Sequence, residues 1–324
     1  MWEQIITTVD NSAVSAAAGD IAIQLAKHNA SVLHGVHVFD FAIHRKRFGA
    51  LMPHLSAEYQ KPKTQHRLEA RHDSVMDLSF SLLGESFLLP LRAKAEAKGI
   101  VFNKAVVDGR PADGICQFIN QNGCELVVMG RTGQGKSPKV GGCARKVMRR
   151  IRDRDFLLVK NGNTGGKIIV GIDGSDYSFN ALKKAIALAE CFGSKIKAVA
   201  VFDLALHETI FNSMKNKLSD KAERVFGSEK QEQLHEEVVD RGIKRVYAAS
   251  VEKAKELALQ QGVEIETAVL PGRAEGKIVE LAKEENASFV VFSRFGLHKT
   301  EESDLGAVAE VLIAEAPCSV LCCK

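Results

Sequence analysis

The sequence lacks the features by which several classes of protein are recognised. Its seven cysteines are odd in number and form no Cys-x-x-Cys pair, which is typical of reduced, mostly buried thiols and not of a disulfide framework. No stretch approaches the ~20 consecutive apolar residues of a membrane span. No basic-then-apolar leader opens the chain, and the net charge of +4 includes no long basic tract. We therefore expect a cytoplasmic protein without a membrane span or a nucleic-acid partner.

What the chain does contain is an internal repeat with an offset of 163 residues. Residues 9–12 lie over residues 172–175, and the match runs at constant offset from Ile5/Ile168 to Gly133/Gly296. The period is the length of a small domain, so the repeat indicates a tandem duplication of one fold. We predict a first domain at residues 1–160, a glycine- and asparagine-rich linker at 161–166, and a second domain at 167–324.

Each half alternates short apolar runs with segments of helical periodicity. In the second half, residues 167–172, 195–202, 265–269, 288–292 and 319–322 read as strands, and residues 272–284 and 306–315 read as helices. Ser175 is placed to cap the helix that follows the first strand. This alternation predicts an α/β fold in which each domain is a doubly wound, five-stranded parallel sheet.

Each domain also carries an inserted segment after its second strand, at residues 41–99 and 204–262. The two inserts differ strongly in sequence. The first contains an apolar stretch, Leu78 to Leu91, that is interrupted by Gly84 and Pro90, and we expect it to pack on its own chain or on a partner. The second is highly charged and is typical of a solvated helical hairpin or long helix.

Four motifs give the sequence a resemblance to the universal stress proteins, over both halves apart from the inserts. They are VGIDGS at 170–175, LPGR at 270–273, the loop from Gly296 to Gly306, and APCSVL at 316–321. The resemblance implies a five-stranded parallel α/β sheet. It also implies that some relatives bind ATP through a loop of the form G-x2-G-x9-G-[ST].

The chemistry of such a loop can be argued without the family. Glycines let the backbone approach phosphates, and the following helix offers N–H groups and a positive dipole end. In parallel sheets, ligands bind beyond the carboxyl ends of the strands. The candidate phosphate ligands are therefore Gly130, Thr132, Gly133, Lys136, Gly141 and Gly142 in the first domain, and Gly296, Gly306 and Ala307 in the second. The resemblance to the family implies in addition that Asp10 and Val38, and Asp173 and Val201, contact the adenosine part of a nucleotide.

The charges of the two loops favour the first domain. Its loop is about two residues shorter than the family pattern if Gly141 is the closing glycine, and it carries Lys136 and Lys139. In the second domain, Ser293 replaces the first glycine and Ala307 replaces the closing hydroxyl residue. Its loop also holds the acids Glu301, Glu302 and Asp304, which would repel phosphates. We expect ATP, with Mg²⁺ accompanying it, in the first domain if in either.

Two other readings of the residues stay open. Residues 130–137 spell GRTGQGKS, a full match to the phosphate loop of nucleotide hydrolases, although the repeat places it after a fourth strand. Asp40/His44 and Asp203/His207 recur at i,i+4 spacing and are candidate metal ligands, but the blander interpretation is an aspartate that caps a helix beside a packed histidine.

The sequence favours a regulatory, nucleotide-binding stress-response protein over an enzyme, because no Ser-His-Asp or Cys-His arrangement offers a nucleophile. The alternatives are a P-loop-like hydrolase that uses residues 130–137 and a ligand-free interaction scaffold with the inserts as its working surface. We also expect the two domains to pair within the chain through their last strands, residues 156–159 and 319–322, and a homodimer as a further assembly.

Overall fold

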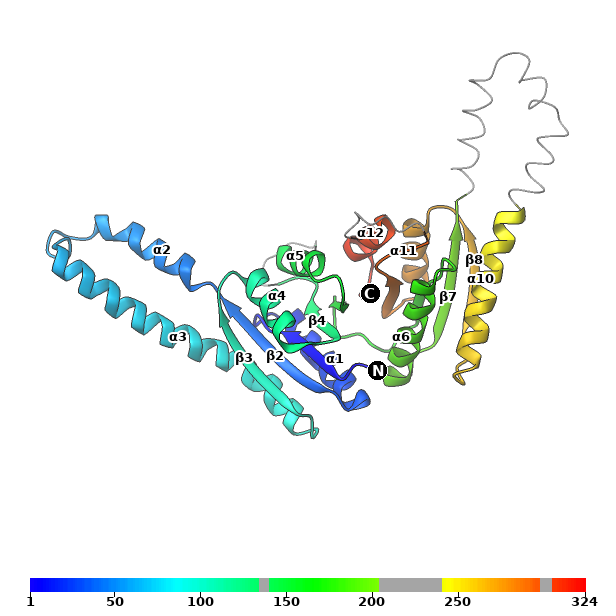
Figure 1. Cartoon of the computed structure of the whole chain (residues 1–324), viewed down its shortest axis with the longest axis horizontal. Coiled ribbons are helices and arrows are strands. Elements are labelled where there is room, and N and C mark those ends of the chain that lie inside the picture. The colour runs from blue at the N-terminus through cyan, green and yellow to red at the C-terminus, as the bar shows by residue number, and fades with distance from the viewer. Residues whose placement is uncertain (134–139, 204–240, 298–304) are drawn as a thin grey trace, which may run out of the picture. The chain divides into compact units, whose positions relative to one another are not determined.

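The computed structural model of the chain describes residues 1–133, 140–203, 241–297 and 305–324 (Figure 1). The chain forms two compact units, Met1–Gly162 and Asn163–Lys324. The division falls inside the glycine- and asparagine-rich segment 161–166. Each unit therefore has about the length of one sequence repeat.

Unit 1 contains a five-stranded parallel sheet. The strands are β1 (Gln4–Thr8), β2 (Val32–Phe39), β3 (Phe102–Asp108), β4 (Leu126–Gly130) and β5 (Asp155–Val159), in the order β3-β2-β1-β4-β5. Strands β4 and β5 consist almost wholly of buried residues, and β1 is buried along its middle, as expected for a parallel sheet covered on both faces. The predicted fold class is confirmed.

The helices of unit 1 cover both faces of this sheet. Helices α1 (Ala13–Asn29) and α3 (Pro62–Glu96) pack on one face, and α4 (Pro111–Asn122) and α5 (Gly142–Arg150) on the other. Helix α1 begins where the Ser12 hydroxyl accepts a hydrogen bond from the Ser15 N–H, at 3.1 Å.

Unit 2 repeats this architecture. Its strands are β6 (Ile168–Gly171), β7 (Ile196–Phe202), β8 (Glu266–Pro271), β9 (Phe289–Ser293) and β10 (Ser319–Cys323), in the order β10-β9-β6-β7-β8. Its helices are α6 (Asp176–Phe192), α10 (Arg241–Leu259), α11 (Ala274–Glu284) and α12 (Ala307–Glu315). Ser175 caps α6, as predicted, by accepting from the Ser178 N–H at 3.2 Å.

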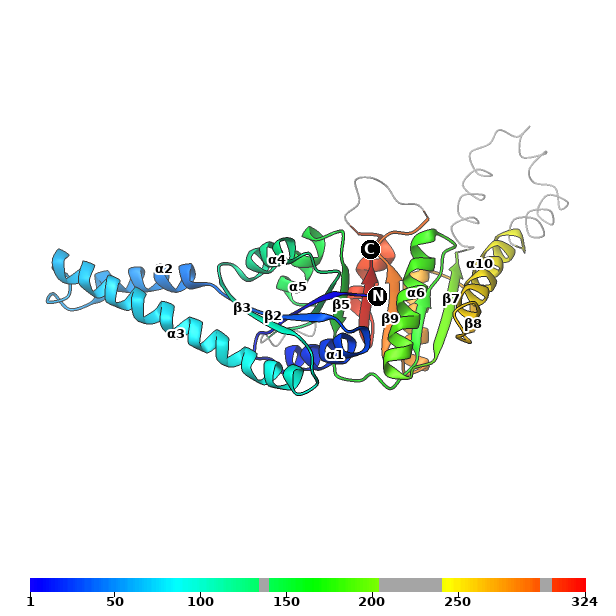
Figure 2. The same ribbon diagram turned by 60° about the horizontal axis from the view of Figure 1, so that its bottom comes forward.

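The first insert forms a helical hairpin. It consists of α2 (Phe41–Leu51), the short 3-10 helix η1 (Met52–His54) and α3. Figures 1 and 2 both show α2 beside the N-terminal half of α3, beyond the edge of the unit 1 sheet. Helix α3 continues through Gly84 and Pro90, where the sequence indicated interruptions. Pro90 lies on the exposed side, and the burial of Leu88 and Leu91 on either side of it holds the helix on the sheet.

Among the described helices, α3 alone is long and apolar enough to cross a membrane, judged by length and composition. The sequence had suggested no such segment, because polar residues break every apolar run in α3 below ~20 residues. A single helix that meets this criterion is weak evidence for a span, and its C-terminal half packs on β2 and β3 of unit 1.

Of the second insert, the described part is α10. Its last residue lies 163 residues after the last residue of α3. The buried positions also keep this offset: Leu88, Leu91 and Ala95 of α3 correspond to Val251, Ala254 and Ala258 of α10, and all six are buried. The repeat therefore extends into the second helix of each insert, although the sequences differ strongly.

Four charged side chains form a network at the amino ends of the unit 2 strands. Lys167 Nζ lies 2.9 Å from Glu266 Oε2 and 2.8 Å from Glu285 Oε2, and Lys197 pairs with the same two glutamates. Hydrogen bonds from Lys167 and then Lys197 lower the pKa of Glu285 to about 2. The network thus ties the end of α11 to β7 and β8.

This pKa predicts an acid-dependent loss of stability. The folded-state pKa of Glu285 lies below its unfolded value of ~4.3, so the carboxylate stabilises the fold above that pH and stops doing so as the pH falls towards about 2. We expect Glu285→Gln to lower Tm by a few degrees at pH 7 and not at all near pH 2, measured by calorimetry. Glu256→Gln, on the exposed side of α10, is the control. An equal effect of Glu285→Gln at both pH values would contradict the prediction.

Candidate functional site

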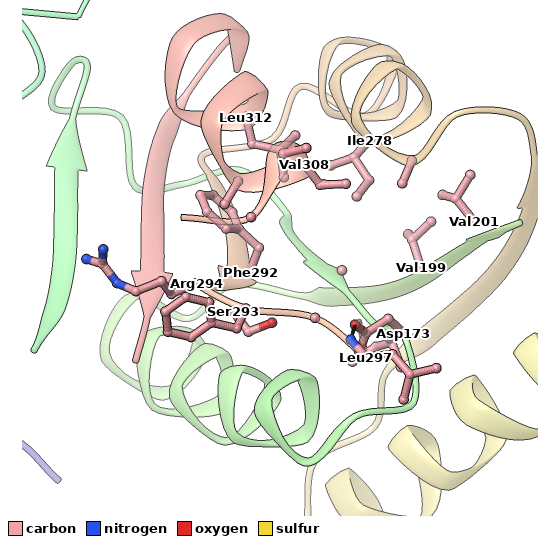
Figure 3. A pocket seen from close by; sticks show the side chains of 18 of the residues that line it. Asp173, Val199, Val201, Ile278, Phe292, Ser293, Arg294, Leu297, Val308 and Leu312 are labelled. Carbon is pink, nitrogen blue, oxygen red and sulfur yellow. Dashed lines mark hydrogen bonds between the residues drawn. The ribbon is translucent and has the colours of Figure 1, made fainter. Parts of the chain in front are cut away.

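The strand order of unit 2 creates a cleft at the carboxyl edge of its sheet. Strand β6 is flanked by β7 on one side and β9 on the other, so the crossovers leave in opposite directions between β6 and β9. A cavity of about 430 Å³ lies at this point, bounded by the ends of β6, β7 and β9 and by the start of α12 (Figure 3). It is the location at which open α/β sheets bind ligands.

The walls of this cavity are mostly apolar. Figure 3 shows Val199 and Val201 of β7, Ile278 of α11, Phe292 of β9 and Leu312 of α12 around it. Strands β7 and β9 contribute these side chains because alternate residues of a strand face the same side of the sheet. The cavity suits a flat apolar or heteroaromatic group.

The polar groups of the cavity gather at its rim. Helix α12 starts after Gly306, whose extended backbone makes it the N-cap, and no side chain caps this end. The N–H groups of the first turn, which begins at Ala307, are therefore not satisfied within the helix and carry its positive dipole end. Ser293 adds a hydroxyl at the end of β9. These groups are suited to an anion.

Asp173 fixes the shape of the rim. Its Oδ1 accepts hydrogen bonds from the N–H of Ser175 at 3.0 Å and from the hydroxyl of the same residue at 2.5 Å. Its Oδ2 accepts from the N–H of Leu297 at 2.8 Å. A Cβ on Gly296 would lie 2.6 Å from that Oδ2. The carboxylate therefore ties the end of β6 to the loop after β9, and Gly296 has no side chain because the carboxylate occupies the space.

We predict that Gly296→Ala destabilises unit 2. The new methyl group would displace the Asp173 carboxylate from the Leu297 N–H, at a cost of about 1–3 kcal/mol in the free energy of unfolding. The measurement is denaturant unfolding of the full chain. Gly276→Ala is the matched control, because a Cβ there meets nothing within 4 Å and alanine favours the α11 helix. Equal stability of the two variants would show that Asp173 does not fix the loop.

Unit 1 has an equivalent but smaller cavity of about 230 Å³. Asp10 again approaches the loop: its Oδ1 accepts from the Ser12 N–H at 3.0 Å, and a Cβ on Gly133 would lie 2.7 Å from its Oδ2. Cys143, in the first turn of α5, also lines the cavity, and burial raises the pKa of its thiol to about 11.

Most of the residues that the sequence singled out do gather in these two cavities. In unit 1 they are Asp10, Val38, Gly130, Thr132, Gly133 and Gly141, and in unit 2 they are Asp173, Val201, Gly296, Gly306 and Ala307. Gly142 is the first residue of α5 and does not line the cavity itself. Lys136, Lys139, Glu301, Glu302 and Asp304 lie outside the described residues, so the charge argument still rests on the sequence.

The closing glycine of the shorter loop is Gly141. It is the N-cap of α5, as Gly306 is of α12. The Gly141 N–H donates to the Arg131 carbonyl at 2.8 Å, and the Gly306 N–H donates to the Arg294 carbonyl at 3.0 Å. The two arginine side chains are buried, and Figure 3 shows that the guanidinium of Arg294 points away from the other lining side chains. It therefore does not face a ligand in the cavity.

The P-loop interpretation of residues 130–137 fits the geometry poorly. In a P-loop the lysine and the hydroxyl residue begin the helix. Helix α5 begins at Gly142, five residues after Ser137, and the preceding strand β4 is the fourth strand of its unit. Lys136 and Ser137 themselves lie outside the described residues. The arrangement favours a glycine turn at the switch point.

Two of the weak metal candidates, Asp40 and His44, have other roles in the structure. Asp40 Oδ1 accepts from the Ile43 N–H at 3.0 Å and so caps α2. His44 stacks on His72 with ring centroids 5.2 Å apart. Asp203 follows β7, and its proposed companion His207 lies outside the described residues. Among the described side chains, no group of three or more potential ligands could hold a metal ion.

Sequence reasoning missed Tyr247. This residue of α10 lines the unit 2 cavity, and its ring centroid lies 6.3 Å from that of Phe202. Its counterpart 163 residues earlier is Gly84, where a Cβ would lie 3.0 Å from the His37 ring and closer still to Val106. The counterpart of His37 is Ala200. At these two pairs of equivalent positions, the larger side chain is therefore His37 of strand β2 in unit 1 and Tyr247 of helix α10 in unit 2.

Comparison with known proteins agrees with this architecture. The model of the universal stress protein family matches residues 1–152 and 166–324. Universal stress protein MJ0531 of Methanocaldococcus jannaschii is 30% identical over 168 residues, which cover 52% of this chain and 87% of the relative. Universal stress protein YxiE of Bacillus subtilis is 28% identical over 155 residues, covering 48% and 96%.

The chain belongs to the universal stress protein family. Its two matches to the family model correspond to its two units. A solved universal stress protein from Archaeoglobus fulgidus shares the fold, with a TM-score of 0.61 and 16% identity, over 99% of this chain and 98% of its own. As a universal stress protein, the chain is a tandem, two-domain member with helical insertions in both domains.

Proposed function

We propose that this universal stress protein binds an adenine nucleotide at the carboxyl edge of its sheets, in a regulatory stress-response role, with unit 2 as the principal site. The observation that carries the proposal is the unit 2 cavity. Its volume of about 430 Å³ lies within the ~300–1,000 Å³ typical of small-molecule sites, whereas the 230 Å³ of unit 1 lies below it. An apolar slot that opens towards a helix N-terminus suits a base with attached phosphates.

The lining residues divide naturally between the parts of a nucleotide. The base would lie between Val201, Ile278 and Tyr247, and the phosphates would lie towards the first turn of α12. Asp173 already accepts three hydrogen bonds in the described structure. A carboxylate has about four acceptor positions, so one is left for a ribose hydroxyl.

Unit 1 is the second candidate, on the strength of charge. Its loop has the leading glycines Gly130 and Gly133 and the lysines Lys136 and Lys139, with no acid. A lysine near a phosphate contributes on the order of 1–2 kcal/mol when partly exposed, and a nearby acid costs about as much. Space therefore favours unit 2 and charge favours unit 1, so the experiment must separate them.

We predict that filling the unit 2 cavity weakens ATP binding. In Val201→Phe the larger ring would occupy the space proposed for the base, and we expect affinity to fall about tenfold or more in calorimetry. The matched variant Val38→Phe fills the unit 1 cavity at the equivalent position and should leave the main binding event intact. The opposite result, or loss of binding only in Lys136→Ala and Gly133→Val, would assign the site to unit 1.

Labelling of Cys143 gives an independent reading of unit 1. Its thiol is protonated at neutral pH, so alkylation should accelerate as the pH rises towards about 11. ATP bound in unit 1 would slow that labelling, and ATP bound in unit 2 would leave it unchanged. Phosphate release with Mg²⁺ present would distinguish hydrolysis from binding alone.

We also predict that the ring of Tyr247 contributes to the affinity. Stacking of a base on an aromatic side chain is worth about 1–3 kcal/mol, so Tyr247→Ala should weaken ATP binding roughly tenfold in calorimetry. Tyr247→Phe keeps the ring and should bind nearly as well as the wild type. If both variants bind like the wild type, the base does not contact α10.

A further inference from the structure

Helix α3 is apolar on two opposite faces. Gly84, Leu88, Leu91 and Ala95 are buried against unit 1. Val75, Leu78, Leu82 and Leu89 lie about half a turn away around the helix axis, and their exposed fractions are 55%, 62%, 58% and 54%. A globular protein normally shows charged and polar residues on the outer face of a surface helix. The outer face of α3 instead presents a stripe of large apolar side chains over about four turns.

Exposed apolar surface is concentrated in this hairpin. Of the fourteen large apolar residues that are exposed in the described part of the chain, eight lie between residues 41 and 99. Four of these form the stripe, and Ile43, Leu51 and Tyr59 lie in α2 and at the hairpin tip. The segment is little more than a fifth of the described residues but holds more than half of these exposed side chains, so this clustering indicates an interaction surface.

The same segment carries the whole net charge of the protein. Residues 41–99 contain ten lysines and arginines and six acids, a net charge of +4, which equals the net charge of the full chain. Arg71 and Arg67 are exposed one and two turns before Val75, respectively, on the side of the stripe. The remaining 265 residues are therefore formally neutral.

We propose that the α2–α3 hairpin docks on an anionic lipid surface, with α3 lying in the plane of the membrane interface. A membrane interface accepts a stripe of leucines without needing a shape-complementary groove, and its lipid phosphates attract arginine and lysine. Both properties of the hairpin, an exposed apolar stripe and an excess of basic residues, match this surface. The inference is independent of nucleotide binding.

The charge pattern argues against a second copy of the chain on this face. In a parallel pairing of two α3 helices, Arg71 of each copy would lie opposite the other, and in an antiparallel pairing centred on Leu82, Arg71 would lie close to Arg92. Two hairpins of net charge +4 would also repel each other along their length. An acidic surface removes both penalties.

The test is sedimentation of the full chain with vesicles. We expect the wild type to sediment with vesicles that contain phosphatidylglycerol, to stay in solution with pure phosphatidylcholine, and to be released by added salt. Leu78→Ser/Leu82→Ser should lower the partition coefficient about tenfold or more. Arg67→Gln/Arg71→Gln should lower it about fivefold per charge. The control Val101→Ser/Leu259→Ser changes two equally exposed residues outside the hairpin and should bind like the wild type.

The same set of variants can overturn the proposal. Binding that is equal for both kinds of vesicle, or equal in all variants, would contradict it. A wild-type chain that binds neither kind of vesicle would also contradict it. If the wild type is then a dimer, and Leu78→Ser/Leu82→Ser converts it to a monomer, the stripe binds a second copy instead. If an acidic protein competes for the stripe while vesicles do not, the partner is a protein. Circular dichroism shows whether each variant keeps its helices.

Discussion

The candidate site depends on the carboxylate that follows the first strand of each unit. Asp173 receives hydrogen bonds from the turn into α6 and from the loop after β9, so it joins the two segments that diverge at the switch point. Asp10 receives the corresponding bond from Ser12. This constraint places a glycine at 296 and at 133, and in unit 2 the bond to the Leu297 N–H keeps the start of the loop after β9 close to the sheet edge. The candidate ligand cavity of each unit lies beside this carboxylate.

Duplication allowed the two cavities to diverge while the frame stayed constant. Two equivalent positions differ in the size of their side chains, which are His37 and Gly84 in unit 1 and Ala200 and Tyr247 in unit 2. In unit 1 a Cβ on Gly84 would lie 3.0 Å from the His37 ring, whereas in unit 2 the ring of Tyr247 lies near that of Phe202 and lines the cavity. Packing alone tolerates either solution, because total volume is what a core conserves. In unit 2, however, the large side chain is Tyr247 of α10, and it lines the cavity. The difference in side-chain size therefore also changes the surface that a ligand would contact.

The fold could be predicted from sequence to a large extent. Buried parallel strands appear as apolar runs, and because of the repeat each strand or helix predicted in one half could be checked against its counterpart in the other. The strand predicted at 319–322 and the helix predicted at 306–315 differ from β10 and α12 by one residue each. Tyr247 could not be predicted, since it lies on an insert helix far along the chain from the loops it meets. Its signal was the 163-residue offset, which continues through the buried positions of the insert helices. The continuous helix through Pro90 was also hidden, because local propensity opposes it and burial on the sheet overrides it.

The inserted helices have separate consequences for the two units. Helix α3 packs its buried face on β2 and β3, and α10 packs its buried face on the equivalent strands β7 and β8, so packing on the sheet uses only one face of each helix. In α10 the available position at the sheet edge holds Tyr247, which modifies the site. In α3 the equivalent position is glycine, and the helix contributes nothing to the cavity of its own unit. Packing within unit 1 does not account for the leucines on its outer face, because those side chains are more than half exposed. An outer face that costs solubility and serves no fold is most simply explained by a surface outside the unit that covers it.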